Sequence, residues 1–302
     1  MRFQLLKLLF VLSSCRHSDT LTVCSFYTGN DFDKTSTELW EERRATIESL
    51  VGSYNFDIVA MQEVNFDRFI SLKKALSDYD NVIGDGEGRM DVEELAPIFF
   101  NSDNFLVLAK SQFWLSETPD LPGSKSWGAL YPRITTWVKL QSKITGHIFF
   151  VFNAHFCHLN EDAQLKSSAL FLKKINEIAG DAPVIVAGNF NAALHSPVEL
   201  LLTSNWDRFH SLQNSARLSK KKQQATKNNR SSKRFVPMRH TDHILVNSYF
   251  TVQNFHPIQS ESIEKLYTGH RPVYAKVKFI FERIPRNGEL QPLPWENRTI
   301  YQ

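Results

Sequence analysis

The stretch Ala182–Ala192 reads APVIVAGNFNA, and the interpretation of the whole chain starts from it. Val184–Ala187 is a short apolar run with β-branched residues, which is typical of a buried strand that stops at Gly188. Asn189 and Asn191 flank a phenylalanine, so strand alternation places both amides on one side and the ring on the other. Amides can bind a phosphate or a metal-bound water, but they cannot take up a proton at neutral pH. We therefore expect a polar site at the end of this strand.

The composition is that of a folded globular protein. The chain has 302 residues, of which 42% are hydrophobic and 12% aromatic, enough for a large core and against a disordered chain. Three cysteines do not make a disulfide framework, and Cys24 and Cys157 lie in strand-like runs that favour buried thiols.

The net charge of +3 hides an uneven distribution. Residues 211–234 contain eight Lys or Arg and no acid, and without them 27 basic residues face 32 acidic ones. The basic segment 217–234 is interpreted either as a solvated loop or as a patch for an anionic partner such as nucleic acid or anionic lipid. It contains no aromatic residue before Phe235, which argues against stacking on single-stranded bases.

The first 19 residues allow two interpretations. Leu12–Cys15 reads LSSC and resembles a bacterial lipoprotein cleavage box, which predicts export and a lipid anchor at Cys15. The uninterrupted apolar run Leu8–Leu12 is shorter than the roughly 7–15 residues of a secretory h-region. The alternative is therefore an N-terminal extension of a cytoplasmic protein.

Strand and helix patterns alternate along residues 20–281 with no linker between two halves. This alternation predicts one α/β domain whose strands form two packed sheets, followed by a C-terminal tail at 282–302. The predicted strands are 21–26, 57–64, 98–100, 105–108, 134–140, 148–154, 184–187, 242–246 and 272–280, and the predicted helices are 40–51, 68–76, 161–179 and 197–202.

Five predicted strands carry polar residues where they begin or end. These residues are Glu63, Asn153 with His155, Asn189 with Asn191, Asp242 and His270. A carboxylate suits Mg²⁺, imidazoles and amides can stabilise charge on phosphoryl oxygens, and an aspartate can orient a neighbouring histidine. Each residue alone is uninformative, but their convergence would make a phosphoester site.

The ordered motifs QEV (62–64), NAH (153–155), GNFN (188–191), DHI (242–244) and GHRPV (269–273) resemble those of the endonuclease/exonuclease/phosphatase superfamily, which has the deoxyribonuclease I-like fold. The resemblance covers roughly residues 20–280, and the segment Phe113–Lys139 resembles the bacterial secreted-type branch. It implies a four-layer α/β sandwich, with two packed mixed β-sheets flanked by helices. It also implies a monomer that hydrolyses phosphate esters with Mg²⁺ or Mn²⁺, on nucleic acids or phospholipid headgroups.

Carried over by position, the resemblance assigns each polar residue a role. Glu63 matches the metal-binding glutamate, and His155 and Asn191 match the pair beside the scissile phosphate. Asp242 and His270 match the acid–imidazole pair, whereas Asn153 and Arg133 match groups that contact the substrate phosphate.

Three positions depart from the family pattern. Tyr27 replaces an asparagine, Asn189 replaces the aspartate credited with orienting or deprotonating the attacking water, and Gly269 replaces a second aspartate. Loss of a general base typically costs about 10²–10⁴-fold in rate. Two functions therefore stay open. One is a metal-dependent phosphodiester hydrolase with an incomplete catalytic set and a weakly bound metal. The other is a depleted member that binds a phosphorylated ligand or partner without turnover.

Overall fold

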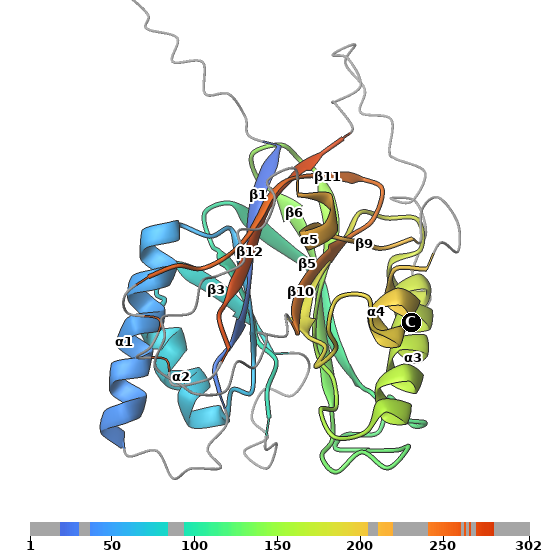
Figure 1. Cartoon of the computed structure of the whole chain (residues 1–302). Helices are drawn as coiled ribbons and strands as arrows, with labels where there is room; N and C mark the ends of the chain where they lie inside the picture. Colours follow the sequence, from blue (N-terminus) through green and yellow to red (C-terminus); the bar gives the residue numbers. More distant parts are fainter. Residues whose placement is uncertain are drawn as a thin grey trace, which may run out of the picture.

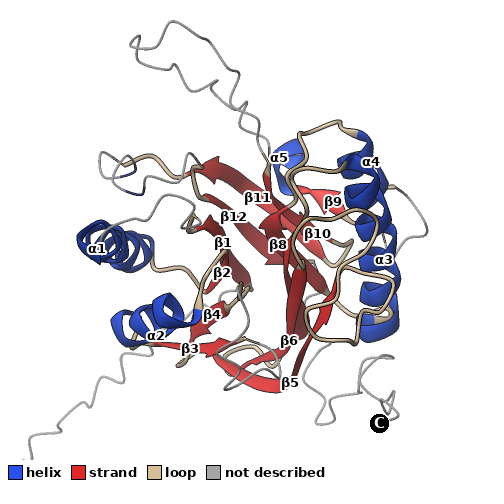
Figure 2. Ribbon diagram, turned by 90° about the horizontal axis from the view of Figure 1, so that it is seen from below, coloured by secondary structure: helices blue, strands red, loops and turns tan. Residues whose placement is uncertain are grey.

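A computed structural model describes residues 19–29, 37–83, 94–204, 211–219, 241–260, 263, 266 and 270–280. Two six-stranded sheets face each other in the middle of the molecule, and helices cover both outer faces (Figures 1 and 2). This is the predicted four-layer α/β sandwich. Among the described residues, no helix is long and apolar enough to cross a membrane.

The first sheet has the order β11-β12-β1-β2-β4-β3 and carries α1 and α2 on its outer face (Figure 2). Its parallel pair β1–β2 lies at the centre, and its remaining pairs are antiparallel. The elements are β1 (Thr20–Tyr27), α1 (Thr37–Tyr54), β2 (Ile58–Gln62), α2 (Phe66–Ala75), β3 (Tyr79–Val82), β4 (Ile98–Asn101), β11 (Phe250–Pro257) and β12 (Val273–Phe279).

The second sheet has the order β5-β6-β7-β8-β10-β9 and carries α3 and α4 on its outer face. Its one parallel pair is β7–β8, whose strands are joined through α3. The elements are β5 (Phe105–Trp114), β6 (Ile134–Ser142), β7 (Ile148–His155), α3 (Glu161–Ala179), β8 (Val184–Asn189), α4 (Pro197–Leu202), β9 (Gln213–Asn214), α5 (Ser215–Leu218) and β10 (Asp242–Val246).

The continuous apolar runs in the sequence arise because the central strands are buried on both faces. In β8, Ile185 and Ala187 face the other sheet, whereas Val184 and Val186 face α3 and α4. Three apolar layers result, one between the sheets and one beneath each helical layer. Cys24 and Cys157 are buried free thiols, as predicted.

The sequence led us to expect that this strand stops at Gly188. In the structure, β8 continues to Asn189. The glycine lies inside the parallel pair, opposite Ala154 of β7. A Cβ atom at position 188 would lie 2.2 Å from the carbonyl oxygen of Ala154. The glycine therefore permits close approach of two backbones, and the strand carries Asn189 to its edge.

Candidate active site

The polar ends of β2, β7, β8 and β10 meet at one end of the two sheets, together with His270, which lies in the segment that leads into β12. His155 is the parallel register partner of Asn189, and Asn189 is the antiparallel partner of Asp242. Glu63 directly follows β2, in the facing sheet. The structure thus brings together residues that lie up to 207 positions apart in the sequence, between Glu63 and His270.

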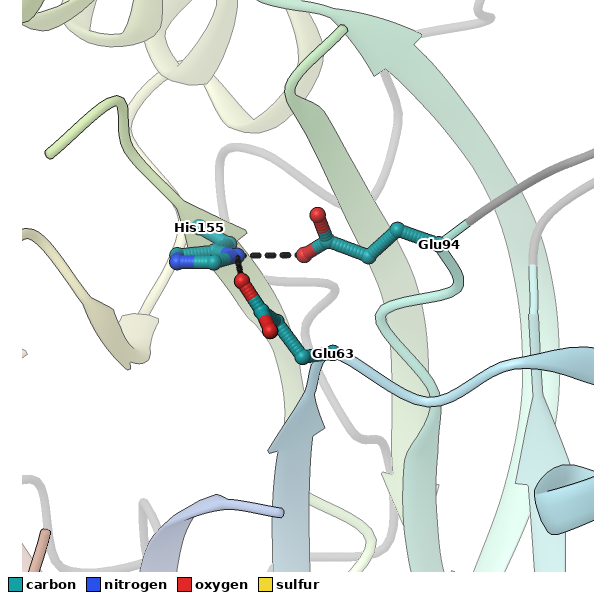
Figure 3. A group of neighbouring side chains, drawn as sticks. All are labelled: Glu63, Glu94 and His155. Carbon is teal, nitrogen blue, oxygen red and sulfur yellow. Dashed lines mark hydrogen bonds and ion pairs between the residues drawn. The ribbon is translucent and has the colours of Figure 1, made fainter. Parts of the chain in front are cut away.

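Glu63, Glu94 and His155 form a compact group (Figure 3). One ligand atom from each side chain lies within 4.8 Å of the others. Nδ1 of His155 contacts Oε1 of Glu94 directly and lies 3.8 Å from Oε1 of Glu63. Glu63 has a φ of +56°, in the left-handed region, so the chain turns sharply as it leaves β2.

Arg133 is the buried cation of this group. Its Nη1 donates to Oε2 of Glu94 at 2.6 Å and lies 3.6 Å from Oε1 of Glu63. The same atom lies 2.9 Å from Nδ1 of His155, and Nη2 lies 3.2 Å from Nδ1 of His158. The sequence-predicted Arg133 is therefore within the site.

The charges in this group shift the pKa values of two neighbours. Burial alone would raise the pKa of Glu94, but His155 and Arg133 outweigh burial, and the pKa falls below its ordinary value. Burial of the His158 ring, together with repulsion from Arg133, lowers the pKa of that imidazole. Glu94 is thus held as a carboxylate, and His158 favours its neutral form.

Sequence reasoning missed Glu94. It lies before β4, and an isolated bridge between Val64 and Leu95 holds it beside the end of β2. Because β2 pairs antiparallel with β4, the segment that leads into β4 runs beside the segment that leaves β2, and the bridge between Val64 and Leu95 places Glu94 there. That pairing would have found Glu94, but the order of strands in a sheet cannot be read from strand patterns alone.

Asn191 contacts both the ring of His155 and the backbone at the end of β7, the strand on which His155 lies. Its Nδ2 donates to the carbonyl of Phe156 at 2.9 Å and lies 3.3 Å from Nε2 of His155. An amide donor at Nε2 fits an imidazole whose Nδ1–H donates to Glu94. The backbone N–H of Asn191 donates to Oδ1 of Asn189 at 2.9 Å, whereas Nδ2 of Asn189 is buried and has no hydrogen-bond partner in the part of the chain that the structure describes.

Asp242 and His270 form the predicted acid–imidazole pair. Nδ1 of His270 lies 2.8 Å from Oδ2 of Asp242, while Oδ1 of Asp242 is buried without a partner. Tyr27 lies beside this pair, with its ring centroid 4.3 Å from that of His270 and 5.8 Å from that of His155. Burial and the charge of the nearby Glu63 carboxylate raise the pKa of Tyr27 well above its ordinary value, so the phenol stays protonated.

Asn153 is buried between the sheets. Its Nδ2 donates to the carbonyls of Met61 at 2.7 Å and Pro97 at 2.9 Å, and its Oδ1 accepts from Gln62 at 2.8 Å. These bonds give Asn153 a structural role in joining β7 to the facing sheet. Its contact with a substrate phosphate stays a prediction.

The donor set fits a divalent cation. Oε2 of Glu63 is a buried carboxylate oxygen that has no hydrogen-bond partner among the described residues. Glu94 and His155 place a second carboxylate and an imidazole within reach of the same point. Unsatisfied buried carboxylate oxygens are costly unless a cation or donor compensates them. The group could therefore hold a metal ion.

Comparison with known families agrees with this geometry. Residues 24–261 match the model of the Endonuclease/Exonuclease/phosphatase family. The chain belongs to this family. Family enzymes generally depend on a divalent metal, in line with the acidic and histidine group found here.

Several known members are similar to this chain. An uncharacterized protein of Acanthamoeba polyphaga mimivirus is 29% identical over 177 residues, covering 56% of this chain and 65% of that protein. The CCR4-Not complex 3'-5'-exoribonuclease subunit Ccr4 of Aspergillus terreus is 28% identical over 159 residues, covering 46% of this chain and 24% of that protein. The matches thus span less than two thirds of these curated relatives.

Among solved structures, the mannosyl-6-phosphatase of Bacteroides thetaiotaomicron is similar over its whole length. It is 29% identical, with a TM-score of 0.72, and the alignment covers 86% of this chain and 100% of that chain. The relatives of this family member therefore include a phosphatase and a nuclease.

Four predicted features lie outside the described residues: Gly269, the basic residues from Lys220 to Arg234, the N-terminal segment with Cys15, and the tail at 282–302. Arg217, the first residue of the basic segment, belongs to α5, and its guanidinium contacts the buried carboxylate of Glu199.

Proposed function

We propose that this protein is a slow, Mg²⁺- or Mn²⁺-dependent hydrolase of phosphate esters. The observation that carries the proposal is the grouping of Glu63, Glu94 and His155 at the same end of the sandwich as the Asp242–His270 pair. Acidic oxygens for a cation on one side and oriented imidazoles on the other are the elements that phosphoryl transfer requires.

In this proposal, Glu63 and Glu94 hold the metal ion. The bound ion supplies Lewis-acid stabilisation of charge on a phosphoryl oxygen. Arg133, already fixed by Glu94, and the side-chain amide of Asn191 orient the phosphate, and His155, which Glu94 and Asn191 hold in place, lies beside it. These contacts use donors that the protein places before substrate arrives, so little reorganisation is needed.

Asp242 contacts Nδ1 of His270 and thereby orients the imidazole, which in this proposal acts on the leaving group or the attacking water. Asn189 can hold that water through its unpartnered Nδ2 but cannot take its proton. We expect the rate to be reduced by about 10²–10⁴-fold relative to a site with an aspartate at this position.

The relatives support a phosphoester substrate without fixing its class, since one is a phosphatase acting on a mannosyl phosphate and another is an exoribonuclease. A nucleic acid, a phosphosugar and a phospholipid headgroup therefore stay open as substrate classes. We also propose that the protein is a monomer of the bacterial secreted-type branch, exported or lipid-anchored at Cys15. The basic segment 217–234 would then contact an anionic partner.

A second candidate is a protein that binds a phosphorylated ligand without turnover. The buried amide of Asn189 favours it, because this strand end presents no carboxylate for water activation. Retention of Glu63, His155 and Asp242 supports binding in either case.

An assay of phosphomonoesterase and phosphodiesterase activity with Mg²⁺ or Mn²⁺ separates the two candidates. The unmodified chain is compared with the Asn189→Asp/Gly269→Asp double variant and with His270→Ala. His256→Ala, on β11, serves as a matched histidine control. EDTA-sensitive turnover by the unmodified chain that is lost in His270→Ala supports the hydrolase. Turnover by the restored double variant alone supports the binding protein, and failure of every variant to bind phosphate or metal contradicts both.

A further inference from the structure

Tyr27 contacts all three groups on which the proposed chemistry depends. It is the last residue of β1, and its ring packs on His270 and meets the edge of His155. The Glu63 carboxylate lies close enough for its charge, together with burial, to raise the pKa of the Tyr27 hydroxyl. The side chain therefore extends from the imidazole pair to the proposed metal ligand.

We infer that Tyr27 determines substrate class, so that the site accepts terminal phosphomonoesters in preference to internal phosphodiesters. This inference rests on the proposed function, because it assumes that the phosphoryl group binds against His155, His270 and a cation at Glu63.

The reason is steric. A phosphomonoester carries one ester arm, and its other three oxygens need only hydrogen-bond donors or a cation. An internal phosphodiester carries a second ester group, which must leave the phosphorus atom in a different direction from the first. Because the Tyr27 ring touches both histidines, it occupies one wall of the space where the phosphorus must lie. That wall closes one exit for a second arm.

The ring is also held in place. It packs on His270 at one side and on His155 at another, and its backbone pairs with Gln62 in the parallel register. Moving the ring aside for a second ester arm would break both ring contacts together. An asparagine at this position would be smaller and would leave that exit open.

The test measures binding as well as turnover, using the full chain with Mg²⁺. Phenyl phosphate and diphenyl phosphate are titrated calorimetrically, and p-nitrophenyl phosphate and bis-p-nitrophenyl phosphate are compared as substrates. Because monoester and diester differ in charge, the informative quantity is how their ratio changes between variants. Tyr27→Asn removes the ring, Tyr27→Phe keeps the ring without the hydroxyl, and Tyr54→Asn, at the end of α1, is the matched control.

We expect the unmodified chain to prefer the monoester by about tenfold or more, in the range that pocket shape supplies. Tyr27→Asn should reduce this preference at least about fivefold, whereas Tyr27→Phe and Tyr54→Asn should keep it. The Phe variant separates the effect of the ring from that of the hydroxyl, because it changes only the polar group near Glu63.

An unchanged ratio in Tyr27→Asn, or no monoester preference in the unmodified chain, overturns the inference while leaving the proposed function intact. Binding of neither ester by any variant overturns both. If circular dichroism shows that Tyr27→Asn does not fold, Tyr27→Trp replaces it. The larger ring should then strengthen the monoester preference, and an unchanged preference overturns the inference.

Discussion

Glu94→Gln tests whether the buried ion group at the site stabilises the fold. Glutamine keeps the shape of the side chain and an oxygen that can accept from Arg133, but it removes the charge. In the native protein Arg133 is only 4% exposed, and it donates to Glu94 at 2.6 Å. After the change, its nearest remaining carboxylate oxygen would be Oε1 of Glu63, at 3.6 Å.

The expected cost is a loss of about 1–3 kcal/mol in the free energy of unfolding at pH 7, since charge-assisted hydrogen bonds contribute this much. Complete removal of one partner of a buried pair costs more, about 3–5 kcal/mol, but glutamine retains one hydrogen bond. The Glu94 side chain is 15% exposed, so solvent screening is limited.

The contribution of Glu94 to the free energy of unfolding should decrease as the pH falls. Burial alone would raise the pKa of Glu94, yet His155 and Arg133 hold it below the ordinary value of 4.5. The carboxylate therefore contributes stability that is present above that value and is lost as the pH falls through the folded-state pKa. The difference in unfolding free energy between the native chain and Glu94→Gln should shrink below pH 4.5.

Urea unfolding in EDTA at several pH values between 7 and 3.5 measures this difference without bound metal. Glu48→Gln is the control, because Glu48 is 49% exposed in its pair with Arg44 and should change stability by less than about 1 kcal/mol. A Glu94→Gln variant as stable as the native chain at pH 7, or a difference that is independent of pH, would refute this reasoning.

Two further predictions concern parts of the fold that support the site. Gly188→Ala should destabilise the protein by about 3 kcal/mol or more, because its Cβ would lie 2.2 Å from Ala154 O. Gly52→Ala in α1, where nothing lies within 4 Å, should instead stabilise it by up to about 1 kcal/mol. Thermal unfolding compares them, and equal effects would contradict the backbone-contact argument. Glu199→Gln should cost about 1–3 kcal/mol in urea unfolding, because this carboxylate is 1% exposed and bound to Arg217. A change of less than about 0.5 kcal/mol there would show that the pair does not stabilise the fold.

Periodicity in the sequence was sufficient for most of the sandwich. The bounds predicted for α3, α4 and β10 coincide with those in the structure, because each pattern begins and ends at clear polar or turn residues. Strand β11 was missed. A register shift between Val252 and Asn254 breaks its alternation, so the buried Phe250 and Phe255 do not fit one period of two.

Polar residues at or beside the ends of the predicted strands could be assigned to the site from the sequence, whereas Glu94 could not. His155 and Asn189 could be expected to be neighbours because both end buried strands. Glu94 precedes a strand, and its place at the site depends on which strands pair. Tyr27 was recognised as a departure from the family pattern, but its contacts with both histidines required coordinates.

The backbone conformation of β8 does not require an acid at position 189. Asn189 pairs with His155 and Asp242 through its main chain, and its Oδ1 accepts from the N–H of Asn191, as either an amide or a carboxylate oxygen can. Only the second side-chain atom, the buried Nδ2, differs in chemistry from an aspartate. The fold therefore requires only Oδ1 of residue 189, whereas activation of a water molecule would require a carboxylate oxygen in place of Nδ2. An intact strand geometry is therefore compatible with both candidate functions, and the decision between them depends on the second atom of this one side chain.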